Sequence, residues 1–386
     1  MKILYFVCGE GLGHATRAIA AGEAMQKNHE FSFASYGYVL DFLQMNGFRT
    51  LETVPEIAMH GLGGSLDAKK SVLESVKKFN PAIITSIAGI LRKEKPDLVI
   101  SDSFFTPVLV ARGSGLQTWM IVNQTNPDMF FENSHRGMRL VGKTVRGFSD
   151  FILGLANRVL IPDFLPPDTI CEKNISSSQK LSPKAEFIGP LVRKGAFTAW
   201  GKKEKNRVFV SIGGFGYRQA LLEKLAQASS ELPDFTFDLV AGPNGRLSGM
   251  SRNVKWHSTV MDPFPLMAKS SLFVCGGGHS TIMESICLGR PLLSVPDMNH
   301  FEQQSNAQKA QDLGIGAKIG YGVSAAELCE KIVCYSSDRK VMKGVSRLRA
   351  LAQKQNGAKR LCSLADGFAQ SKGINSTSAI TSTVRS

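Results

Sequence analysis

An apolar run that leads into three consecutive glycines and then into a helix start constrains this chain more than any other segment. Residues 273–275 form the apolar run, residues 276–278 are the glycines, and Ser280 and Thr281 stand at the start of the expected helix. A helix that begins at such a turn leaves backbone N–H groups unpaired, and a phosphate can come close to them because glycine has no side chain. The segment therefore predicts a strand, a tight turn and a helix with an anion site at its N-terminus.

Polar residues further along extend this site. Glu284 lies about one helical turn after Ser280, so it faces the same side and can accept hydrogen bonds from the two hydroxyls of a ribose. Residues 299–304 gather amides, an acid and an imidazole after the next apolar run, at the strand end where open α/β sheets bind ligands. This order suggests a nucleotide-sugar. The alternative is a plain strand-to-helix turn, with Ser280 as the N-cap and Glu284 on a solvated face.

Short continuous apolar runs alternate with helical patterns in both halves, as is typical of parallel strands covered on both faces. The expected strands are 3–8, 31–35, 51–54, 98–101 and 118–122, then 208–212, 235–240, 254–257, 272–274 and 292–295. A long helix is expected to end near Arg92. We therefore predict an α/β fold of two Rossmann-like, doubly wound domains that face each other across a cleft. The expected boundaries are 1–190, an exposed lysine-rich linker 191–206, 207–368, and a disordered tail 369–386.

The cysteines and the N-terminus indicate a cytoplasmic protein. The seven cysteines form no Cys-x-x-Cys pair and several lie inside apolar runs, which is typical of reduced, buried thiols. They imply no metal site. Met1 and Lys2 lead at once into an apolar run without the features of a signal peptide, and no apolar run approaches the roughly 18 residues of a membrane span.

The formal charge of +14 is concentrated in two regions. Residues 338–386 hold ten Lys or Arg and two acids, and residues 133–149 hold four cations and no acid, with several Phe residues in and around the block. Cations mixed with large apolar groups predict contact between residues 129–151 and an anionic membrane surface. A solvated helix with a buried apolar face is the alternative. Neither region carries a nucleic-acid recognition motif, so no nucleic acid is expected as a partner.

The glycine-rich loop 9–13 after the first expected strand ends at His14. His14 stands where a dinucleotide-binding loop keeps its third glycine, and no acid follows strand 31–35, so a nicotinamide cofactor is not favoured. An imidazole there is suited to general base work, and Asp102 at the end of strand 98–101 lies at the same sheet edge, where it can orient the imidazole. A structural histidine and an N-cap aspartate are the alternatives.

In their order along the chain, these motifs resemble those of the two-domain GT-B glycosyltransferases, and among them the MurG-like branch with the UDP-glycosyltransferases. The resemblance extends to about residue 368 and is closest to uncharacterised archaeal-type members that open with Cys-Gly-Glu-Gly-Leu-Gly-His, here residues 8–14. It also rests on Gly189-Pro190, the loop at Gly213-Gly214, and residues 277–284 and 300–306. The loop 213–216 lacks the Ser-Gln of MurG, and residues 299–301 differ from its donor loop, so MurG's lipid substrate is not transferred.

The resemblance implies roles for individual residues. The residues implied for the donor pyrophosphate are Gly277, Gly278, His279, Ser280 and Thr281, with Gly214 nearby. Glu284 is implied to hold the ribose, and Phe264 closes the loop 261–264 that clasps the base. The residues implied at the sugar are Glu302 and Gln303, with Gln304 and His300 beside them. His14 is implied as the base with Asp102 as its partner, and Gly11, Gly13 and Asn123 belong to the loop and acceptor side.

The expectation is an inverting, metal-independent glycosyltransferase that moves a hexose or N-acetylhexosamine from a UDP-sugar to a hydroxyl acceptor. No Asp-x-Asp pair occurs in the chain, and no cofactor is expected besides the donor substrate. The acceptor is expected to be lipid-linked, at the inner face of the plasma membrane. The alternatives are a UDP-sugar 2-epimerase, which shares the two facing domains and the nucleotide site, and a non-catalytic nucleotide-sugar-binding subunit at the membrane.

Overall fold

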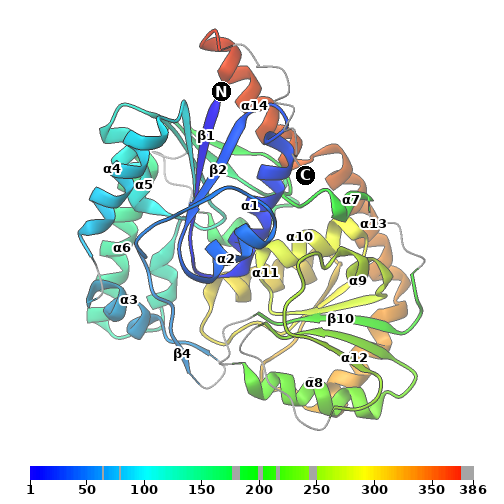
Figure 1. Cartoon of the computed structure of the whole chain (residues 1–386). Coiled ribbons are helices and arrows are strands. Elements are labelled where there is room, and N and C mark those ends of the chain that lie inside the picture. Colours follow the sequence, from blue (N-terminus) through cyan, green and yellow to red (C-terminus); the bar gives the residue numbers. More distant parts are fainter. Residues whose placement is uncertain are drawn as a thin grey trace.

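Two parallel β-sheets, each covered by helices, organise the chain (Figure 1). The computed structural model describes residues 1–62, 65–77, 80–175, 183–198, 203–213, 218–242 and 250–374. The first sheet has the strand order β3-β2-β1-β6-β7-β8-β9, and the second has β12-β11-β10-β13-β14-β15. Numbered within its own sheet, the second order is 3-2-1-4-5-6, the order of doubly wound nucleotide-binding domains. The predicted fold class of two Rossmann-like domains is therefore confirmed.

The first domain takes up the chain to about residue 190. Its sheet strands are β1 (Lys2–Val7), β2 (Glu30–Ser35), β3 (Thr50–Glu52), β6 (Leu98–Asp102), β7 (Gln117–Ile121), β8 (Arg158–Ile161) and β9 (Ala185–Phe187). Its helices are α1 (Leu12–Met25), α2 (Gly37–Met45), α3 (Ala68–Lys77), α4 (Ala82–Glu94), α5 (Phe105–Gly113) and α6 (Arg136–Leu155). The shorter elements are the hairpin β4 (Gly61–Leu62) and β5 (Ser65–Leu66), and the 3₁₀ turns η1 (Pro127–Phe131) and η2 (Glu172–Asn174).

The second domain repeats this alternation. Its strands are β10 (Arg207–Ser211), β11 (Thr236–Val240), β12 (Val254–His257), β13 (Leu272–Cys275), β14 (Leu292–Ser294) and β15 (Gly316–Lys318). The helices of this part of the chain are α7 (Gly195–Thr198), α8 (Gln219–Glu231), α9 (Phe264–Lys269), α10 (His279–Leu288), α11 (Phe301–Asp312), α12 (Ala325–Ser337), α13 (Arg339–Lys354) and α14 (Gly357–Ser371).

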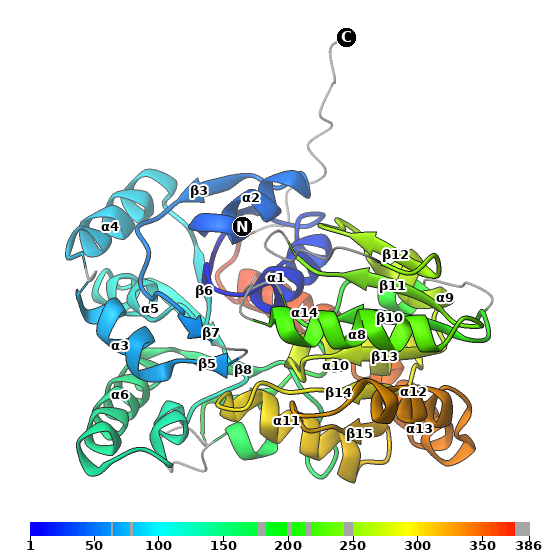
Figure 2. The same ribbon diagram turned by 90° about the horizontal axis from the view of Figure 1, so that it is seen from below.

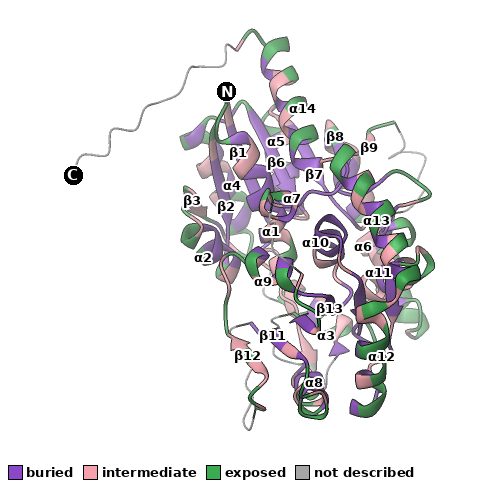
Figure 3. Cartoon of the chain, turned by 90° about the vertical axis from the view of Figure 1, so that its right-hand side faces the viewer, coloured by how far each residue is buried: buried purple, intermediate pink, exposed green. Residues whose placement is uncertain are grey.

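The expected strands match the structure because they are buried on both faces. All residues of β6 and of β13 are buried, and the central strands form the purple interior in Figure 3. The expected long helix ending near Arg92 is instead two helices, α3 and α4. Pro81 occupies the N-cap position of α4 because proline lacks the N–H that a helix interior requires.

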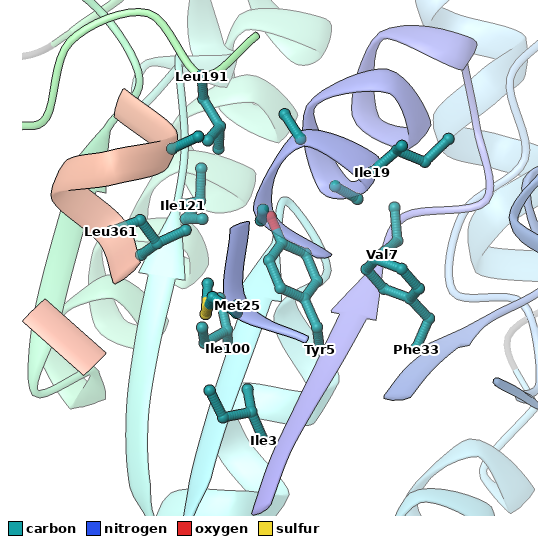
Figure 4. Close-up of a cluster of buried hydrophobic side chains, with 14 of the residues drawn as sticks. Ile3, Tyr5, Val7, Ile19, Met25, Phe33, Ile100, Ile121, Leu191 and Leu361 are labelled. Carbon is teal, nitrogen blue, oxygen red and sulfur yellow. The ribbon is translucent and has the colours of Figure 1, made fainter. Parts of the chain in front are cut away.

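The last helix returns to the first domain. Leu361 of α14 lies among the buried side chains of the first sheet, close to Ile121 and Leu191 (Figure 4). The expected second domain, 207–368, therefore includes a helix whose apolar face packs in the first domain. The expected linker 191–206 also differs from an exposed segment, since Leu191 and Ala196 are buried. α14 extends to Ser371, and residues 375–386 of the expected tail lie outside the described residues.

The two domains meet at corresponding points of their sheets (Figure 2). In each sheet the strand order reverses between two neighbouring strands, β1 and β6 in the first and β10 and β13 in the second. Open α/β sheets bind ligands at the carboxyl ends of such strand pairs. Helices α1 and α10, which follow β1 and β13, contact each other between the sheets. This contact brings the two predicted loops together.

Candidate active site

A cavity of about 900 Å³ lies between the domains. Its lining in the first domain includes the loop 9–13, His14, Arg17 and Asn123. Its lining in the second domain includes Gly276, Gly278, His279, Ser280, Thr281, His300, Glu302 and Gln303. Most of the residues predicted for the site, which lie far apart in the sequence, therefore surround one space.

The N-terminus of α10 faces this cavity, where an anion site is predicted. The helix begins after Gly278, whose position as N-cap leaves the first-turn amides without a side-chain acceptor. Gly277 has φ +78°, and a Cβ there would lie 2.8 Å from the carbonyl oxygen of Gln303, so this position requires glycine. Ser280 is not the N-cap, because it lies inside the first turn of α10, and its hydroxyl donates to the carbonyl oxygen of Gly13 at 2.9 Å. The alternative of a plain capped turn does not describe this helix start.

Glu284 is buried, not solvated. Its side chain makes no hydrogen bond within the described part of the chain, and it lies one turn into α10, outside the lining of the cavity. Burial raises the pKa of Glu284 to about 8, although the charge of Arg193 opposes this shift. At neutral pH this carboxyl group is therefore mostly protonated, and it can offer a ligand one O–H donor and its remaining oxygen lone pairs as acceptors.

The start of α11 supplies the acid and amides at the other end of the anion site. Glu302 accepts hydrogen bonds from Asn123 at 2.8 Å and, more weakly, from Asn306 at 3.4 Å. The side chain of Gln303 accepts from the backbone N–H of Asp297 at 3.2 Å and lines the cavity. Gln304 instead donates to the carbonyl oxygen of Asp297 and does not line the cavity.

His300 is the N-cap residue of α11, and its ring contacts the first domain. Its ring lies edge-on to Phe130, with the centroids 5.2 Å apart, and its Nδ1 has no partner among the described residues. Burial lowers the pKa of His300, although the nearby charges of Glu302 and Asp297 oppose this shift. His300 therefore faces the cavity as a largely neutral ring.

The side of the cavity predicted to bind the base is built differently from the prediction. Its lining comes from residues 258–260, with Val240 and Gly242 beside them. Phe264 does not line it, because its ring is buried in the core of the second domain. Gly214 lies outside the described residues, while Gly213 does line the cavity.

His14 and Asp102 are in contact at the carboxyl ends of β1 and β6. Nδ1 of His14 lies 2.9 Å from Oδ1 of Asp102, and Asp102 is completely buried. Nη2 of Arg17, which can only donate, also lies 2.9 Å from Nδ1 of His14. In the tautomer with its hydrogen on Nδ1, the ring donates to Asp102 and Nε2 is free to take a proton. The pair has the arrangement of a base and the group that orients it.

Arg17 is a site residue that the sequence analysis does not single out. It is 3% exposed, and its Nε donates to Oδ2 of Asp102 at 2.6 Å, while a second nitrogen donates to Oδ1. Burial alone would raise the pKa of Asp102, but the charge and hydrogen bonds of Arg17, with that of His14, hold it at about 2. The available signal was the spacing of Arg17 three residues after His14, which places both on one side of α1.

A second buried aspartate anchors α10 to the first domain. Nε2 of His279 lies 3.0 Å from Oδ2 of Asp163, which follows β8. Asp163 and His279, with Cys171, are the described group whose atoms are close enough for a metal ion. The oxygens of Asp163 already accept from the backbone N–H groups of Phe164, Ile170 and Cys171 at 2.7 to 3.1 Å. These bonds anchor the loop that follows β8, and Asp163 also holds the imidazole of His279. The backbone of His279 can still face a phosphate.

Comparisons with known proteins agree with this arrangement. The family model for glycosyl transferase family 1 matches residues 1–332. The chain is 34% identical over 366 residues to an uncharacterised glycosyltransferase of Methanosarcina acetivorans, which covers 94% of this chain and 97% of that one. An uncharacterised glycosyltransferase of Methanosarcina mazei is 32% identical, covering 96% and 100%.

Solved structures show the same fold at low sequence identity. The glycotransferase of kitacinnamycin matches with a TM-score of 0.70 at 19% identity, covering 95% of this chain and 98% of that one. The spinosyn rhamnosyltransferase SpnG, also solved in complex with thymidine diphosphate, matches with a TM-score of 0.68 at 16% identity, covering 95% and 100%. The fold is therefore the GT-B arrangement of glycosyltransferases. The chain belongs to glycosyl transferase family 1, and it is a glycosyltransferase.

Proposed function

We propose that this enzyme transfers a hexose or N-acetylhexosamine from a UDP-sugar to a hydroxyl acceptor with inversion at the anomeric carbon. The observation that carries the proposal is the contact of His14 with Asp102 beside the open N-terminus of α10, both on one cavity. One group can take a proton from an acceptor, and the other can hold a diphosphate. The nucleotide-sugar class also fits the neighbour SpnG, whose structure was solved with thymidine diphosphate.

In the proposed reaction, the acceptor oxygen attacks the anomeric carbon while the bond from that carbon to the diphosphate oxygen breaks. The hydroxyl proton passes to Nε2 of His14, and the electron pair of the broken bond stays on the diphosphate. Asp102 stabilises the imidazolium that forms, because it stays ionised beside Arg17. A single displacement of this kind inverts the configuration.

The departing diphosphate gains negative charge at the N-terminus of α10. Backbone amides of the first turn and the positive end of the helix dipole stabilise that charge. This provides a physical basis for a reaction that does not depend on a metal ion. Glu284 is proposed to receive the ribose hydroxyls, and Glu302 with Gln303 is proposed to receive those of the sugar.

The proposed acceptor is lipid-linked, and the proposed location is the cytoplasmic face of a membrane. Helix α6 supports this, because Leu140, Phe148 and Phe151 are 66%, 50% and 56% exposed beside the exposed cations Arg139 and Lys143. Large apolar groups next to cations fit an anionic bilayer surface. Among the described residues, no helix is both long and apolar enough to cross a bilayer.

The proposal is tested first by donor binding and then by transfer. Thermal unfolding is followed with UDP-, GDP- and dTDP-sugars, because a ligand that binds only the folded state raises the midpoint temperature. A stabilising nucleotide-sugar is then incubated with lipid-linked and soluble acceptors that carry a free hydroxyl, and the anomeric configuration of the product is read by NMR. Stabilisation by UDP-sugars and an inverted product are expected. Stabilisation by dTDP- or GDP-sugars alone would contradict the proposed donor, and a retained configuration would contradict the proposed mechanism.

A further inference from the structure

A chain of buried hydrogen bonds joins the proposed base to the proposed sugar-binding acid across the domain boundary. Arg17 donates from Nη1 to Oδ1 of Asn123 at 2.9 Å, and Asn123 donates from Nδ2 to Oε1 of Glu302 at 2.8 Å. At its other end Arg17 holds both oxygens of Asp102, which contacts His14. Arg17 and Asn123 are 3% and 5% exposed, so water competes little for these bonds.

The geometry points to a positioning relay, and this inference rests on the proposed function. We propose that Asn123 caps Glu302 when no donor is bound, and that the sugar of the donor displaces this cap. Asn123 and Arg17 then rearrange, and the new position of Arg17 sets the orientation of Asp102 and His14. The base is thereby oriented for attack only when a sugar occupies the site.

The donor and acceptor groups of the side chains make Asn123 the link between Arg17 and Glu302. An arginine guanidinium only donates and a carboxylate only accepts, whereas the Asn123 amide does both. Asn123 is therefore the member that can join the cation Arg17 to the acid Glu302 without a proton transfer. The neutral amide of Asn123 also binds Glu302 less strongly than a charged group would, so sugar hydroxyls can replace it.

Arg17 and Asn123 are positioning residues in this scheme, since they act through Asp102 and Glu302. The test begins with the variant Asn123→Ala, and UDP and UDP-sugar affinities are measured by calorimetry. Affinity for UDP is expected to stay unchanged, while affinity for the UDP-sugar rises about fivefold, the equivalent of one net hydrogen bond that no longer has to be displaced. The turnover number is expected to fall about 10- to 100-fold, because the base loses its alignment. General structural damage would weaken both ligands together.

Arg17→Lys keeps a positive charge beside Asp102 but cannot reach Asp102 and Asn123 together. Its turnover is expected to fall about tenfold or more while its affinity for UDP is kept. The matched controls are Asn126→Ala, an amide that donates to the carbonyl oxygen of Lys173, and Arg112→Lys, a guanidinium that donates to backbone carbonyls. Both controls are expected to keep wild-type turnover.

A spectroscopic readout does not depend on turnover. In protein with ¹⁵N-labelled histidine, the Nδ1–H signal of His14 is assigned with the variant His14→Gln. The UDP-sugar is expected to shift this signal further than UDP does in the wild type, and this additional shift is expected to vanish in Asn123→Ala. The relay is overturned if the additional shift persists in Asn123→Ala, if its turnover is unchanged, or if it binds the UDP-sugar more weakly than the wild type does. A wild type that binds no nucleotide-sugar overturns the proposed function and the relay together, whereas a wild type that binds and turns over with an unaffected Asn123→Ala overturns the relay alone.

Discussion

Two buried carboxyl groups near the cavity differ in the charge that accompanies them. Asp102 lies against the guanidinium of Arg17, which outweighs the effect of burial and holds the pKa of Asp102 at about 2. Glu284 has Arg193 only as a distant charge, so burial dominates and raises the pKa of Glu284 to about 8. Equal burial therefore produces opposite protonation states at neutral pH. At neutral pH Asp102 stays charged beside the imidazole of His14, whereas Glu284 is mostly protonated.

At the residue scale, replacing His14 with alanine is expected to lower turnover by about 10²- to 10⁴-fold, because the acceptor proton loses its base. Affinity for UDP is expected to stay nearly intact, because the backbone amides at the start of α10 that are proposed to hold the diphosphate are unchanged. Steady-state kinetics and calorimetry measure the two effects. Full activity in His14→Ala would mean that the histidine is structural.

Glu284 also predicts how stability depends on pH. Its pKa is raised in the folded state, so between about pH 5 and pH 8 the folded protein keeps a proton that the unfolded chain releases. The contribution of Glu284 to the free energy of unfolding therefore falls as pH rises through this window. Urea unfolding of Glu284→Gln at several pH values is expected to show a flatter dependence than the wild type. The exposed Glu330→Gln serves as the control, and an equal slope in Glu284→Gln would contradict the assignment.

At the element scale, helix α6 shows how one helix can face both a core and another medium. Ile152 and Leu153 are buried against β7 and α5, whereas Phe148 and Phe151 point outward. The outward apolar groups stay exposed in the folded state and leave a surface that water solvates poorly. Helix α6 is therefore the element most suited to contact with a membrane.

Changing Leu140, Phe148 and Phe151 together to serine is expected to weaken binding to anionic liposomes by tenfold or more. Each large apolar side chain that enters the bilayer boundary contributes about 1.5 kcal/mol or more. Liposome sedimentation with and without anionic lipid measures this, with the exposed Val333→Ser on α12 as the control. Equal sedimentation of the triple variant, or no sedimentation of the wild type, would favour a soluble acceptor.

At the scale of the whole molecule, the two domains are held together by crossings of the chain and by side chains. Asp297 accepts hydrogen bonds from Ser65 and from the backbone N–H of Leu66, at 2.8 and 2.7 Å, and Arg193 pairs with Glu23 at 2.9 Å. Helix α14 follows the second domain in the sequence and completes the core of the first domain. Phe164 and Ile170 in turn lie in the core of the second domain, so neither half of the sequence contains all of its own core.

Leu361→Ala on α14 is expected to lower the free energy of unfolding by about 2–5 kcal/mol, because it leaves a cavity in the first domain. Urea unfolding measures the change, with the partly exposed Leu109→Ala as the control. The prediction is wrong if both variants lose the same small amount of stability, since α14 would then be a dispensable extension.

Most of the predicted strands and loops occur where the local sequence indicates them, because a parallel strand buried on both faces is a short apolar run. β8, β9 and β15 were not predicted. β9 and β15 each have a charged residue among three, so neither forms a continuous apolar run. For the site, the positions of His14 and Glu302 near strand-to-helix junctions are evident from the sequence. The exclusion of Phe264 from the cavity is not evident, because its burial depends on how α9 packs in the second domain.

The sequence alone determined the alternation of strands and helices, the glycine turns and, to within one residue, the helix start expected at Ser280, because these depend on neighbours along the chain. The tertiary structure alone decided the partners of the charged groups. Arg17 reaches Asp102 across 85 positions and Asn123 across 106, and Asn123 reaches Glu302 across 179. The first two contacts follow from the pairing of β1, β6 and β7 within the first sheet, and the third follows from the contact between the two domains. No local pattern encodes either arrangement.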